Sequence, residues 1–337
     1  MKIQENISLK PYNTFGIDKK ARFFAIASSI DDFRQAISFA EKNGIELFVL
    51  GGGSNILLTS DQDKLVVKNE LKGIKVTGSD EDFVWVKVGA GEIWHDLVRY
   101  AISQNWGGIE NLSLIPGTVG ASPMQNIGAY GVEIKDVFDN LEALHRKSGE
   151  IHQFQSPDCE FGYRESVFKH RLKNQYIITS VTFKLSKKPQ LNTAYGAIQE
   201  TLKAMNTEIP TVKAISDAVI HIRLSKLPDP AKIGNAGSFF KNPTISSAQF
   251  EELQSNFPSI PGYPNKEGVK VPAGWLIEQA GWKGRKFGEV GVHDKQALVL
   301  VNYGNGDGAA IEELSKKIQK SVEEKFGIKL SPEVNFL

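Results

Sequence analysis

The chain has 337 residues, 41% hydrophobic and 23% charged, a composition typical of a globular protein with two or three domains. Its 40 Lys and Arg balance 39 Asp and Glu, which argues against a protein that binds nucleic acid or an anionic membrane surface. No apolar run approaches the ~18 residues of a membrane span, and residues 1–17 lack the apolar core of a signal peptide.

The first part of the chain predicts a β-α-β unit. The predicted elements are a strand over 21–27, a helix over 28–44 and a strand over 45–50. Ser29 and Asp32 have the spacing of a capping box at the helix start, and Gly44 stands where the helix would end. The second strand leads directly into a run of glycines.

The remaining elements are mixed rather than strictly alternating, which is typical of an α+β chain. We expect a domain boundary near Leu227–Pro230, because two prolines in three residues interrupt regular structure. The predicted elements before it are a strand over 83–91, a helix over 92–108 closed by Gly107 and Gly108, a hairpin over 140–154 turning at Ser148-Gly149, and a strand over 176–185. Those after it are helices over 247–256, 273–280 and about 308–325, and a strand over 297–302.

A run of three glycines, Gly51 to Gly53, follows the strand over 45–50 and precedes Ser54 and Asn55. Glycines let backbone N–H groups turn toward a bound anion, and the two polar side chains add donors. The alternative is a tight surface turn, but three glycines lose much chain entropy on folding, so phosphate binding is favoured. Ile56 stands where a dinucleotide-binding fingerprint requires its last glycine.

A second glycine-rich segment spans residues 115–134 and contains Gln125, Asn126 and Tyr130. It is too apolar for a disordered linker and long for a turn. Ordered loops of this kind usually contact a ligand, and side-chain amides can bind the edge of a flat heteroaromatic ring. The alternative is a packed Ω-loop without a ligand.

Three polar residues lie in apolar or glycine-rich surroundings. Arg164 is either part of a structural ion pair or a clamp for a carboxylate or phosphate. Ser238 follows a glycine-punctuated turn, but no histidine lies near it in sequence to act as the base of a nucleophile. Glu333 lies in an apolar tail, where it is either a docked carboxylate or a solvated terminal residue.

Cysteine and histidine give no sign of a metal site. Cys159 is the single cysteine, and no Cys/His group has zinc spacing. The scattered histidines are expected to be structural. We therefore expect a cytoplasmic protein with no internal disulfide and no structural metal.

Taken in order, the motifs resemble those of the UDP-N-acetylenolpyruvoylglucosamine reductase family, the MurB family. The resemblance covers nearly the whole chain and is carried by YNTFGI (12–17), VLGGGSN (49–55), IPGTVGASPMQNIGAYG (115–131), FGYRESVF (161–168), SKLPDP (225–230), GNAGSFFKNP (234–243) and PEVNF (332–336). It implies an α+β fold, with an FAD-binding domain of the vanillyl-alcohol-oxidase and CO-dehydrogenase-flavoprotein type and an α+β substrate-binding domain. The implied boundaries are 1–70 for a first FAD-binding subdomain completed by 326–337, 71–226 for the second, and 227–325 for the substrate-binding domain.

The resemblance also implies an activity. NADPH would reduce non-covalently bound FAD, and UDP-N-acetylglucosamine enolpyruvate would then take a hydride at C3 and a proton at C2. The product, UDP-N-acetylmuramate, serves peptidoglycan synthesis, and we expect a cytoplasmic monomer with small-molecule partners and no nucleic acid or membrane partner. Two other functions stay open, a flavin oxidase of the same FAD fold and a non-catalytic nucleotide-sugar-binding protein. Many such oxidases attach FAD through a His or Cys in the glycine loop, and Gly51–Asn55 contains neither.

Roles for individual residues follow from the resemblance. The implied catalytic residues are Ser238, which would protonate C2, and Arg164 and Glu333, which would polarise the substrate carboxylate. The implied FAD-binding residues are Gly51, Gly52, Gly53, Ser54, Asn55, Pro116, Gly117, Gly120, Ser122, Gln125, Asn126, Ile127, Gly128, Tyr130 and Arg223. The implied substrate-binding residues are Lys226, Asn242, Lys283 and Gln296, together with Tyr195, which matches a tyrosine that closes over the substrate in the longer of two family subtypes. Asn335 stands where related members carry an arginine near the flavin.

Overall fold

The computed structural model describes residues 1–337 and divides the chain into two compact units. Unit 1 comprises Met1–Ile7, Ala21–Gly52 and Gln62–Ser225, and unit 2 comprises Ser8–Lys20, Gly53–Asp61 and Lys226–Leu337. None of the helices combines the length and the apolar character that a membrane crossing requires. The domain boundaries implied by the family resemblance stay a prediction.

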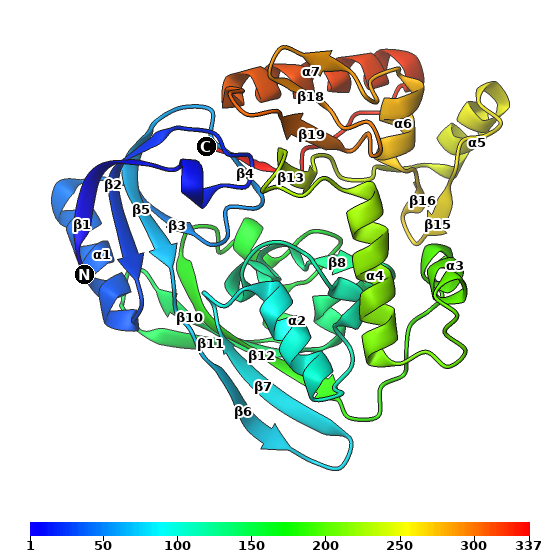
Figure 1. Ribbon diagram of the computed structural model, residues 1–337. Coiled ribbons are helices and arrows are strands. Elements are labelled where there is room, and N and C mark those ends of the chain that lie inside the picture. Colours follow the sequence, from blue (N-terminus) through cyan, green and yellow to red (C-terminus); the bar gives the residue numbers. More distant parts are fainter. The chain divides into compact units, whose positions relative to one another are not determined.

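One sheet of unit 1 has four strands and contains the predicted β-α-β unit. Its order is β1 (Ile3–Ser8), β2 (Lys20–Ala27), β5 (Gln62–Asn69), β3 (Leu47–Leu50). The helix α1 (Ile30–Asn43) connects β2 to β3 and buries Phe33, Ala36 and Ala40 in the same core cluster as strand residues (Figure 1). Both β2 and β3 pair with β5 in parallel, so the unit is confirmed, with β5 inserted between its two strands.

The ends of α1 are those that the sequence predicts. The Ser29 hydroxyl accepts a hydrogen bond from Asp32 N at 3.1 Å, and the Asp32 carboxylate accepts one from Ser29 N at 3.0 Å. Gly44 ends the helix with φ 60°, a left-handed conformation that costs glycine little. The predicted capping box is confirmed.

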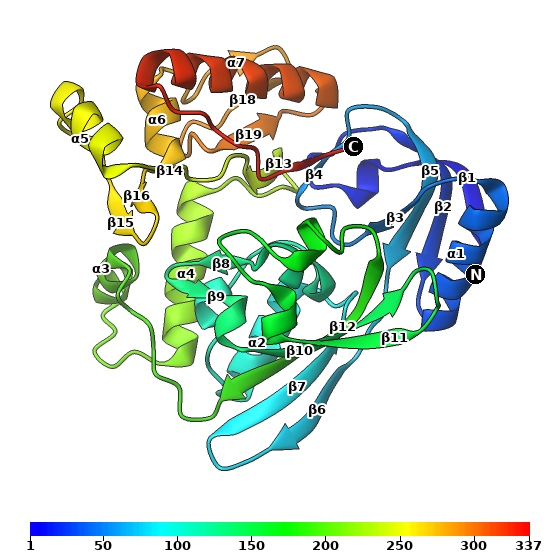
Figure 2. The same ribbon diagram turned by 180° about the vertical axis from the view of Figure 1, so that it is seen from behind.

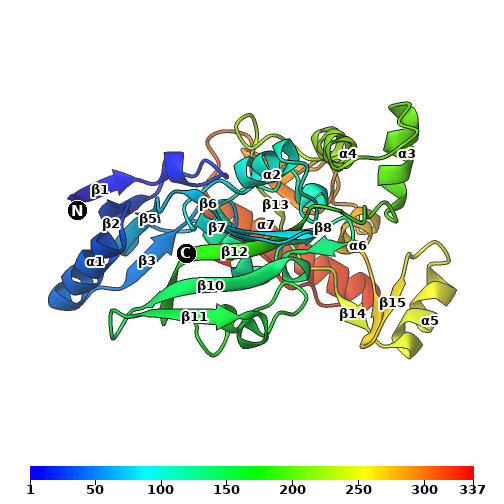
Figure 3. The ribbon, with the colours of Figure 1, turned by 90° about the horizontal axis from the view of Figure 1, so that it is seen from below.

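The second sheet of unit 1 has five antiparallel strands. Its order is β11 (Ile151–Gln155), β10 (Phe138–His145), β12 (Tyr176–Ser186), β7 (Phe83–Gly89), β6 (Ile74–Ser79). The hairpin β10–β11 turns through Gly149 at φ 71°, as predicted. The helix α2 (Trp94–Ser103) lies against one face of this sheet (Figure 3).

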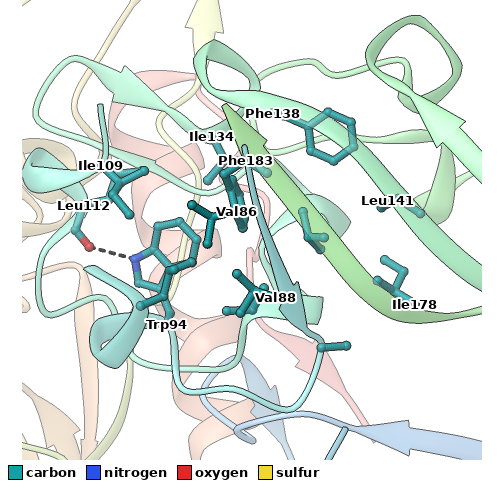
Figure 4. Close-up of a cluster of buried hydrophobic side chains, with 14 of the residues drawn as sticks. Val86, Val88, Trp94, Ile109, Leu112, Ile134, Phe138, Leu141, Ile178 and Phe183 are labelled. Carbon is teal, nitrogen blue, oxygen red and sulfur yellow. Dashed lines mark hydrogen bonds between the residues drawn. The ribbon is translucent and has the colours of Figure 1, made fainter. Parts of the chain in front are cut away.

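Alternate residues of β7 form the core between this sheet and α2. Val86 and Val88 are fully buried, and the Trp94 ring meets the Phe183 ring edge-on at 5.7 Å between centroids. Trp94 Nε1 donates to the Leu112 carbonyl at 2.9 Å, which satisfies the polar end of a buried side chain (Figure 4). This packing fixes the start of α2 beside the second glycine-rich segment.

The predicted end of α2 was wrong. The helix ends at Ser103 rather than at the glycines 107–108. Asn105 adopts a left-handed conformation at φ 57°, and Trp106 N donates back to Ala101 O at 2.9 Å. Asparagine tolerates this conformation better than most residues, so it ends the helix before either glycine.

Two helices and several short elements complete unit 1. The sequence analysis did not predict α3 (Gly196–Ala204) or α4 (Val212–Lys226). The short strands are β8 (Gly128–Ala129) and β9 (Val132–Glu133), and the 3₁₀ turns are η2 (Glu110–Leu112), η3 (Val119–Ala121), η4 (Pro123–Gln125), η5 (Ile134–Asp136), η6 (Ser156–Cys159) and η7 (Val167–Lys169).

Unit 2 is built on a four-stranded antiparallel sheet with α7 (Gly308–Phe326) alongside β18 and β19 (Figure 2). The sheet order is β13 (Gly234–Ser238), β19 (Val299–Asn302), β18 (Val290–Val292), β17 (Lys286–Phe287). The other elements are the sheet β14 (Thr244–Ile245), β16 (Gly268–Lys270), β15 (Tyr263–Asn265), the helices α5 (Ser247–Asn256) and α6 (Ala273–Gln279), the turn η1 (Lys10–Tyr12) and the parallel pair β4 (Ile56–Leu57) and β20 (Asn335–Phe336). The three helices and the strand predicted for this region are confirmed as α5, α6, α7 and β19, with small shifts at their ends.

Candidate active site

The two glycine-rich segments touch each other within unit 1. A Cβ added to Gly52 would lie 2.7 Å from the Cα of Gly117, closer than real Cβ atoms approach a neighbour. One added to Gly51 would lie 2.7 Å from Thr118 Oγ1. Only glycine permits this backbone approach, so the identity of Gly52 is explained by a contact that the sequence did not indicate.

The second glycine-rich segment is more ordered than a single long loop. It contains η3, η4 and the hairpin β8–β9, and the buried Asn126 holds these parts together. Asn126 Nδ2 donates to Glu133 Oε2 and to Gly162 O, both at 3.0 Å, and its Oδ1 accepts from Lys135 N at 3.1 Å. Its side chain therefore shapes the segment through protein contacts.

Arg164 lies beside this segment in unit 1. Its Nη2 donates to the Gly128 carbonyl at 2.6 Å, and its guanidinium carbon lies 5.4 Å from the centroid of the Tyr163 ring. Arg164 also adopts a left-handed backbone conformation, with φ 57°. The structure thus joins two segments that the sequence singled out separately.

Tyr130, Tyr195 and Arg223 form a second group in unit 1. The Tyr130 and Tyr195 rings meet edge-on with centroids 5.2 Å apart. Burial raises the pKa of Tyr130, while a hydrogen bond with Arg223 opposes that shift. Burial lowers the pKa of Arg223, and its Nε is buried with no hydrogen-bond partner. A buried guanidinium donor without a partner, next to Tyr130, suits a ligand with an acceptor group.

In unit 2, a β-bulge sets the position of Ser238. The register of β13 against β19 shifts between Asn235 and Ser238, and Gly237 adopts φ 68°. The buried Asn235 holds this bulge, because its Nδ2 donates to Ile233 O at 2.9 Å and its Oδ1 accepts from Gly237 N at 2.9 Å. Ser238 follows as an exposed residue directly before the buried Phe239.

The C-terminal tail is docked beside Ser238 in the same unit. Glu333 N donates to Phe239 O at 2.8 Å, and Lys241 N donates to Ser331 O at 2.9 Å. Asn55 Nδ2 donates to Glu333 O at 3.2 Å. Hydrogen bonds to the Glu333 backbone therefore bring Ser238, Glu333 and Asn55 into one region. Glu333 does not lie in a frayed terminus.

Two of the predicted substrate-binding residues, Asn242 and Gln296, each lie close to a residue at the start of α6. Asn242 Oδ1 accepts from Ala273 N at 2.9 Å, and Gln296 Oε1 lies 3.0 Å from where a Cβ on Gly274 would be. Lys283 lies beyond the other end of α6 and pairs with Glu278 at 2.9 Å. Lys226 is exposed at the end of α4, and no hydrogen bond or ion pair joins it to the other three.

Sequence reasoning missed two buried or half-buried groups in unit 1, one beside Tyr130 and one beside Leu114. Asn111 is 1% exposed and donates from Nδ2 to Tyr130 O at 3.0 Å. His95 accepts at Nδ1 from Leu114 N at 2.9 Å, and burial, reinforced by the charge of Arg99, lowers its pKa. Neither residue stands in a motif, so no local signal could have identified it. No group of three or more His, Cys, Asp or Glu is placed to hold a metal ion.

Comparison with known proteins decides the family. A relative from Flavobacterium johnsoniae named UDP-N-acetylenolpyruvoylglucosamine reductase is 52% identical over the full length of both chains. Relatives of the same name from Amoebophilus asiaticus and Pseudomonas aeruginosa are 51% and 47% identical, over 100% and 99% of both chains. This chain belongs to the UDP-N-acetylenolpyruvoylglucosamine reductase family. The family that the motifs predicted is confirmed, and so is the assignment of the protein as an oxidoreductase.

Family models and solved structures agree with this assignment. Residues 229–337 match the C-terminal domain of UDP-N-acetylenolpyruvoylglucosamine reductase, and residues 21–155 match an FAD binding domain. The reductase from Thermus caldophilus aligns over 100% of this chain and 99% of its own, with TM-score 0.70 and 24% identity. A 6-hydroxy-D-nicotine oxidase from Arthrobacter nicotinovorans aligns over 97% and 86%, with TM-score 0.51 and 13% identity. The predicted α+β fold, with its FAD-binding and substrate-binding domains, is confirmed.

The residues present fit the FAD that the matched domain implies. The close approach of Gly52 to Gly117 places the backbone of the three-glycine run next to the second glycine-rich segment without an intervening side chain, as anion-binding backbone requires. Arg223 Nε adds a buried donor with no protein partner. The prediction of FAD as cofactor is confirmed, whereas the residues that hold it stay a prediction.

Proposed function

We propose that this chain reduces UDP-N-acetylglucosamine enolpyruvate to UDP-N-acetylmuramate, with NADPH as the source of electrons. The support is its full-length similarity to relatives of that name, together with the exposed Ser238 beside a docked Glu333 in unit 2. FAD, when bound, supplies hydride chemistry that connects the two substrates. The residues of the chain must supply the proton, the positioning and the charge stabilisation.

Ser238 is the proposed proton donor. Addition of hydride at C3 of an enolpyruvyl carboxylate places negative charge across C2 and the carboxylate, and that charge requires a proton at C2. A serine hydroxyl is a weak acid, but it faces a strongly basic carbon, so it needs no histidine partner. The bulge at Gly237 gives Ser238 its exposure, while Asn235 keeps the bulge in place.

Arg164 and Glu333 are the proposed groups that polarise the carboxylate. Arg164 carries a permanent positive charge and a fork of donors that matches a carboxylate. Its hydrogen bond to Gly128 O holds the guanidinium in place before substrate arrives. Glu333 is held through its backbone by Phe239 and Asn55, which positions it beside Ser238 without using its carboxyl group. In this proposal Arg164 acts as a cation and Glu333 as an acid that donates a hydrogen bond, because an ionised carboxylate would repel the developing negative charge. Preorganised groups of this kind stabilise that charge without reorganising during the reaction.

The remaining proposed residues bind the substrate or FAD. Asn242, Gln296, Lys283 and Lys226 bind the nucleotide sugar, and Tyr195 closes over it. Asn242 uses its carbonyl oxygen to hold α6, which leaves its amide N–H groups for a substrate oxygen. The half-buried Tyr130 and Arg223 contact FAD together with the two glycine-rich segments. We also propose a cytoplasmic monomer, and sedimentation of the purified protein tests its oligomeric state.

Anaerobic spectroscopy tests the proposed function against its rivals. The purified protein should be yellow, should bleach with NADPH, and should regain its colour when UDP-N-acetylglucosamine enolpyruvate is added without oxygen. An oxidase would regain colour only with oxygen, and a nucleotide-sugar-binding protein would be colourless. Either of those outcomes contradicts the proposal.

A further inference from the structure

The tip of the hairpin β8–β9 is strained. Two residues, Tyr130 and Gly131, connect the strands, with φ of 50° and 80°. Two-residue turns of this type usually have Asn or Asp before Gly, because a bulky side chain disfavours positive φ. Holding tyrosine there costs free energy, and such strain persists only where surrounding contacts enforce it.

Two asparagines from distant parts of unit 1 supply those contacts. Asn111 Nδ2 donates to the Tyr130 carbonyl at 3.0 Å, and Asn192 Nδ2 donates to the Gly131 carbonyl at 3.1 Å. Both carbonyls of the strained turn therefore have a side-chain amide as partner. We call Asn111, Asn192, Tyr130 and Gly131 the amide cluster.

The amide cluster also fixes the segment that carries Tyr195. Asn111 Nδ2 makes a second hydrogen bond, to the Asn192 carbonyl at 3.0 Å. Asn192 Oδ1 accepts from Ala194 N at 3.2 Å, and Tyr195 follows immediately at the start of α3. Asn111 thus holds both sides of the contact between the Tyr130 and Tyr195 rings.

Asn111 acts only as a donor in this arrangement. Its Oδ1 is buried with no partner, which costs stability, whereas both its amide hydrogens are used. A side chain chosen for packing alone would avoid an unpaired buried oxygen. Tyr195 itself is 51% exposed.

We propose that Asn111 is a positioning residue for Tyr195, acting through Asn192 and the Tyr130–Gly131 turn. In this role it sets the place from which Tyr195 closes over the nucleotide sugar, so the inference rests on the proposed function of Tyr195. Asn111 is 1% exposed, so this role is an indirect one. Its effect should appear in substrate binding and not in the reaction with NADPH.

Hydrogen exchange of the ligand-free protein tests the cluster without reference to activity. Asn111→Asp keeps the shape of the side chain but removes both donors, and Asn192→Ala is a milder change at a partly exposed residue should the first variant fold poorly. Both should speed amide exchange at residues 193–198. Asn206→Asp, an exposed change of the same type just after α3, is the matched control and should leave that exchange unchanged. Unchanged exchange in both cluster variants would overturn the proposal.

A double-mutant cycle tests the link to Tyr195. Asn192→Ala should raise KM for the enolpyruvyl substrate about fivefold, the factor equivalent to ~1 kcal/mol, and leave flavin reduction by NADPH within about twofold. Combined with Tyr195→Ala, it should add nothing further, because its effect passes through Tyr195. Effects that multiply in the double variant would show an unrelated structural role. Should the wild-type protein fail to reduce this substrate, the exchange result would still decide whether the cluster holds the segment.

Discussion

At the scale of single residues, the site depends on positions whose backbone is unusual. Gly237 has positive φ and exposes Ser238, while Arg164 and Tyr130 adopt positive φ without being glycine. Tyr130 is held by a hydrogen bond from Asn111, which lies in another part of unit 1. Gly237 and Arg164 have partners close to them in the chain, since Asn235 Oδ1 accepts from Gly237 N and Lys169 Nζ donates to Arg164 O. The motif around Tyr130 does not indicate its partner, because Asn111 lies far from it in the chain.

Ser238→Ala should slow the reoxidation of reduced enzyme by the enolpyruvyl substrate by at least about 10²-fold, the lower end of a general acid's contribution. Reduction by NADPH should stay within a few fold, because no serine proton takes part in it. Stopped-flow measurement of the two half-reactions separates these effects. Ser238→Cys should keep more activity than alanine, since a thiol also donates a proton.

The opposing possibility is that Ser238 only packs in its turn. Alanine would then cost roughly 1 kcal/mol of stability, and both half-reactions would change slightly and together. Reoxidation of the alanine variant at nearly the wild-type rate would end the assignment of Ser238 as proton donor.

Tyr195→Phe should raise KM for the enolpyruvyl substrate while leaving the flavin spectrum and the NADPH half-reaction nearly intact. The physical reason is that the Tyr195 ring is half exposed and its hydroxyl is available to a ligand. Steady-state kinetics with each substrate varied in turn measures the effect. Equal damage to both half-reactions would remove Tyr195 from the substrate-binding residues.

Glu110 should make the stability of the protein depend on pH. Its carboxyl is 3% exposed, and burial raises its pKa above the ordinary 4.5, although Gly108 N donates to Oε2 at 2.6 Å. Because the folded state holds this proton more tightly, Glu110 stabilises the fold fully below pH 4.5 and loses that contribution as pH rises through the folded pKa.

Glu110→Gln stays neutral, so it should raise Tm relative to wild type by an amount that grows from acidic to mildly alkaline pH. Thermal unfolding across that range measures the difference. Glu5→Gln changes an exposed carboxylate and is the matched control, with no such trend expected. A Tm difference that shrinks as pH rises would contradict the assignment.

At the scale of elements, the sequence predicted those helices and turns whose formation depends on residues close together in the chain. The capping box of α1, the hairpin β10–β11 and the helices of unit 2 all follow from nearby residues, and all are present. The end of α2 was misplaced because Asn105 ended the helix where glycine was expected to do so. The helix α4 was missed, although Thr211 Oγ1 accepts from Ala214 N at 3.1 Å and is a recognisable start signal.

Most of the candidate site residues stand in motifs that the sequence showed, but the sequence did not show how these motifs are arranged in space. Contacts such as Gly52 with Gly117, or Glu333 with Phe239, join residues far apart in sequence. Hydrophobic periodicity and turn residues indicate only the local structure of adjacent residues, so they cannot show which loops contact each other. The buried Asn111 belongs to no motif and becomes visible only once the turn at Tyr130 is folded.

Ser29→Ala should destabilise unit 1 by about 1 kcal/mol, because it removes the side-chain acceptor for Asp32 N at the start of α1. Ser28→Ala is the matched control, since only the Ser28 backbone binds Asp32. Denaturant unfolding of both variants measures the difference. Equal stability of the two would contradict a capping role.

Gly52→Ala should weaken FAD binding strongly, because the added Cβ would collide with Gly117 Cα and separate the two glycine-rich segments. Gly196→Ala is the control: nothing lies within 4 Å of its added Cβ, and its φ is ordinary. Titration of FAD into each apoprotein measures the effect. Unchanged affinity in Gly52→Ala would place FAD away from these segments.

At the scale of the whole molecule, cofactor binding and stability should be coupled through a non-covalent FAD. The run Gly51–Asn55 offers no His or Cys for attachment. The single cysteine, Cys159, is buried, and burial raises its pKa to about 12, so almost none of it is the reactive thiolate near neutral pH.

Acid precipitation of the holoprotein should therefore release all the flavin into the supernatant. A ligand that binds only the folded state stabilises it by mass action, by ~2.7 kcal/mol at a free concentration 100 times Kd. Added FAD should accordingly raise the Tm of the apoprotein, and the rise should continue with FAD concentration after the site is filled, because a reversible ligand keeps shifting the equilibrium. A covalent flavin would stay on the precipitate, and the Tm of the holoprotein would then not respond to added FAD.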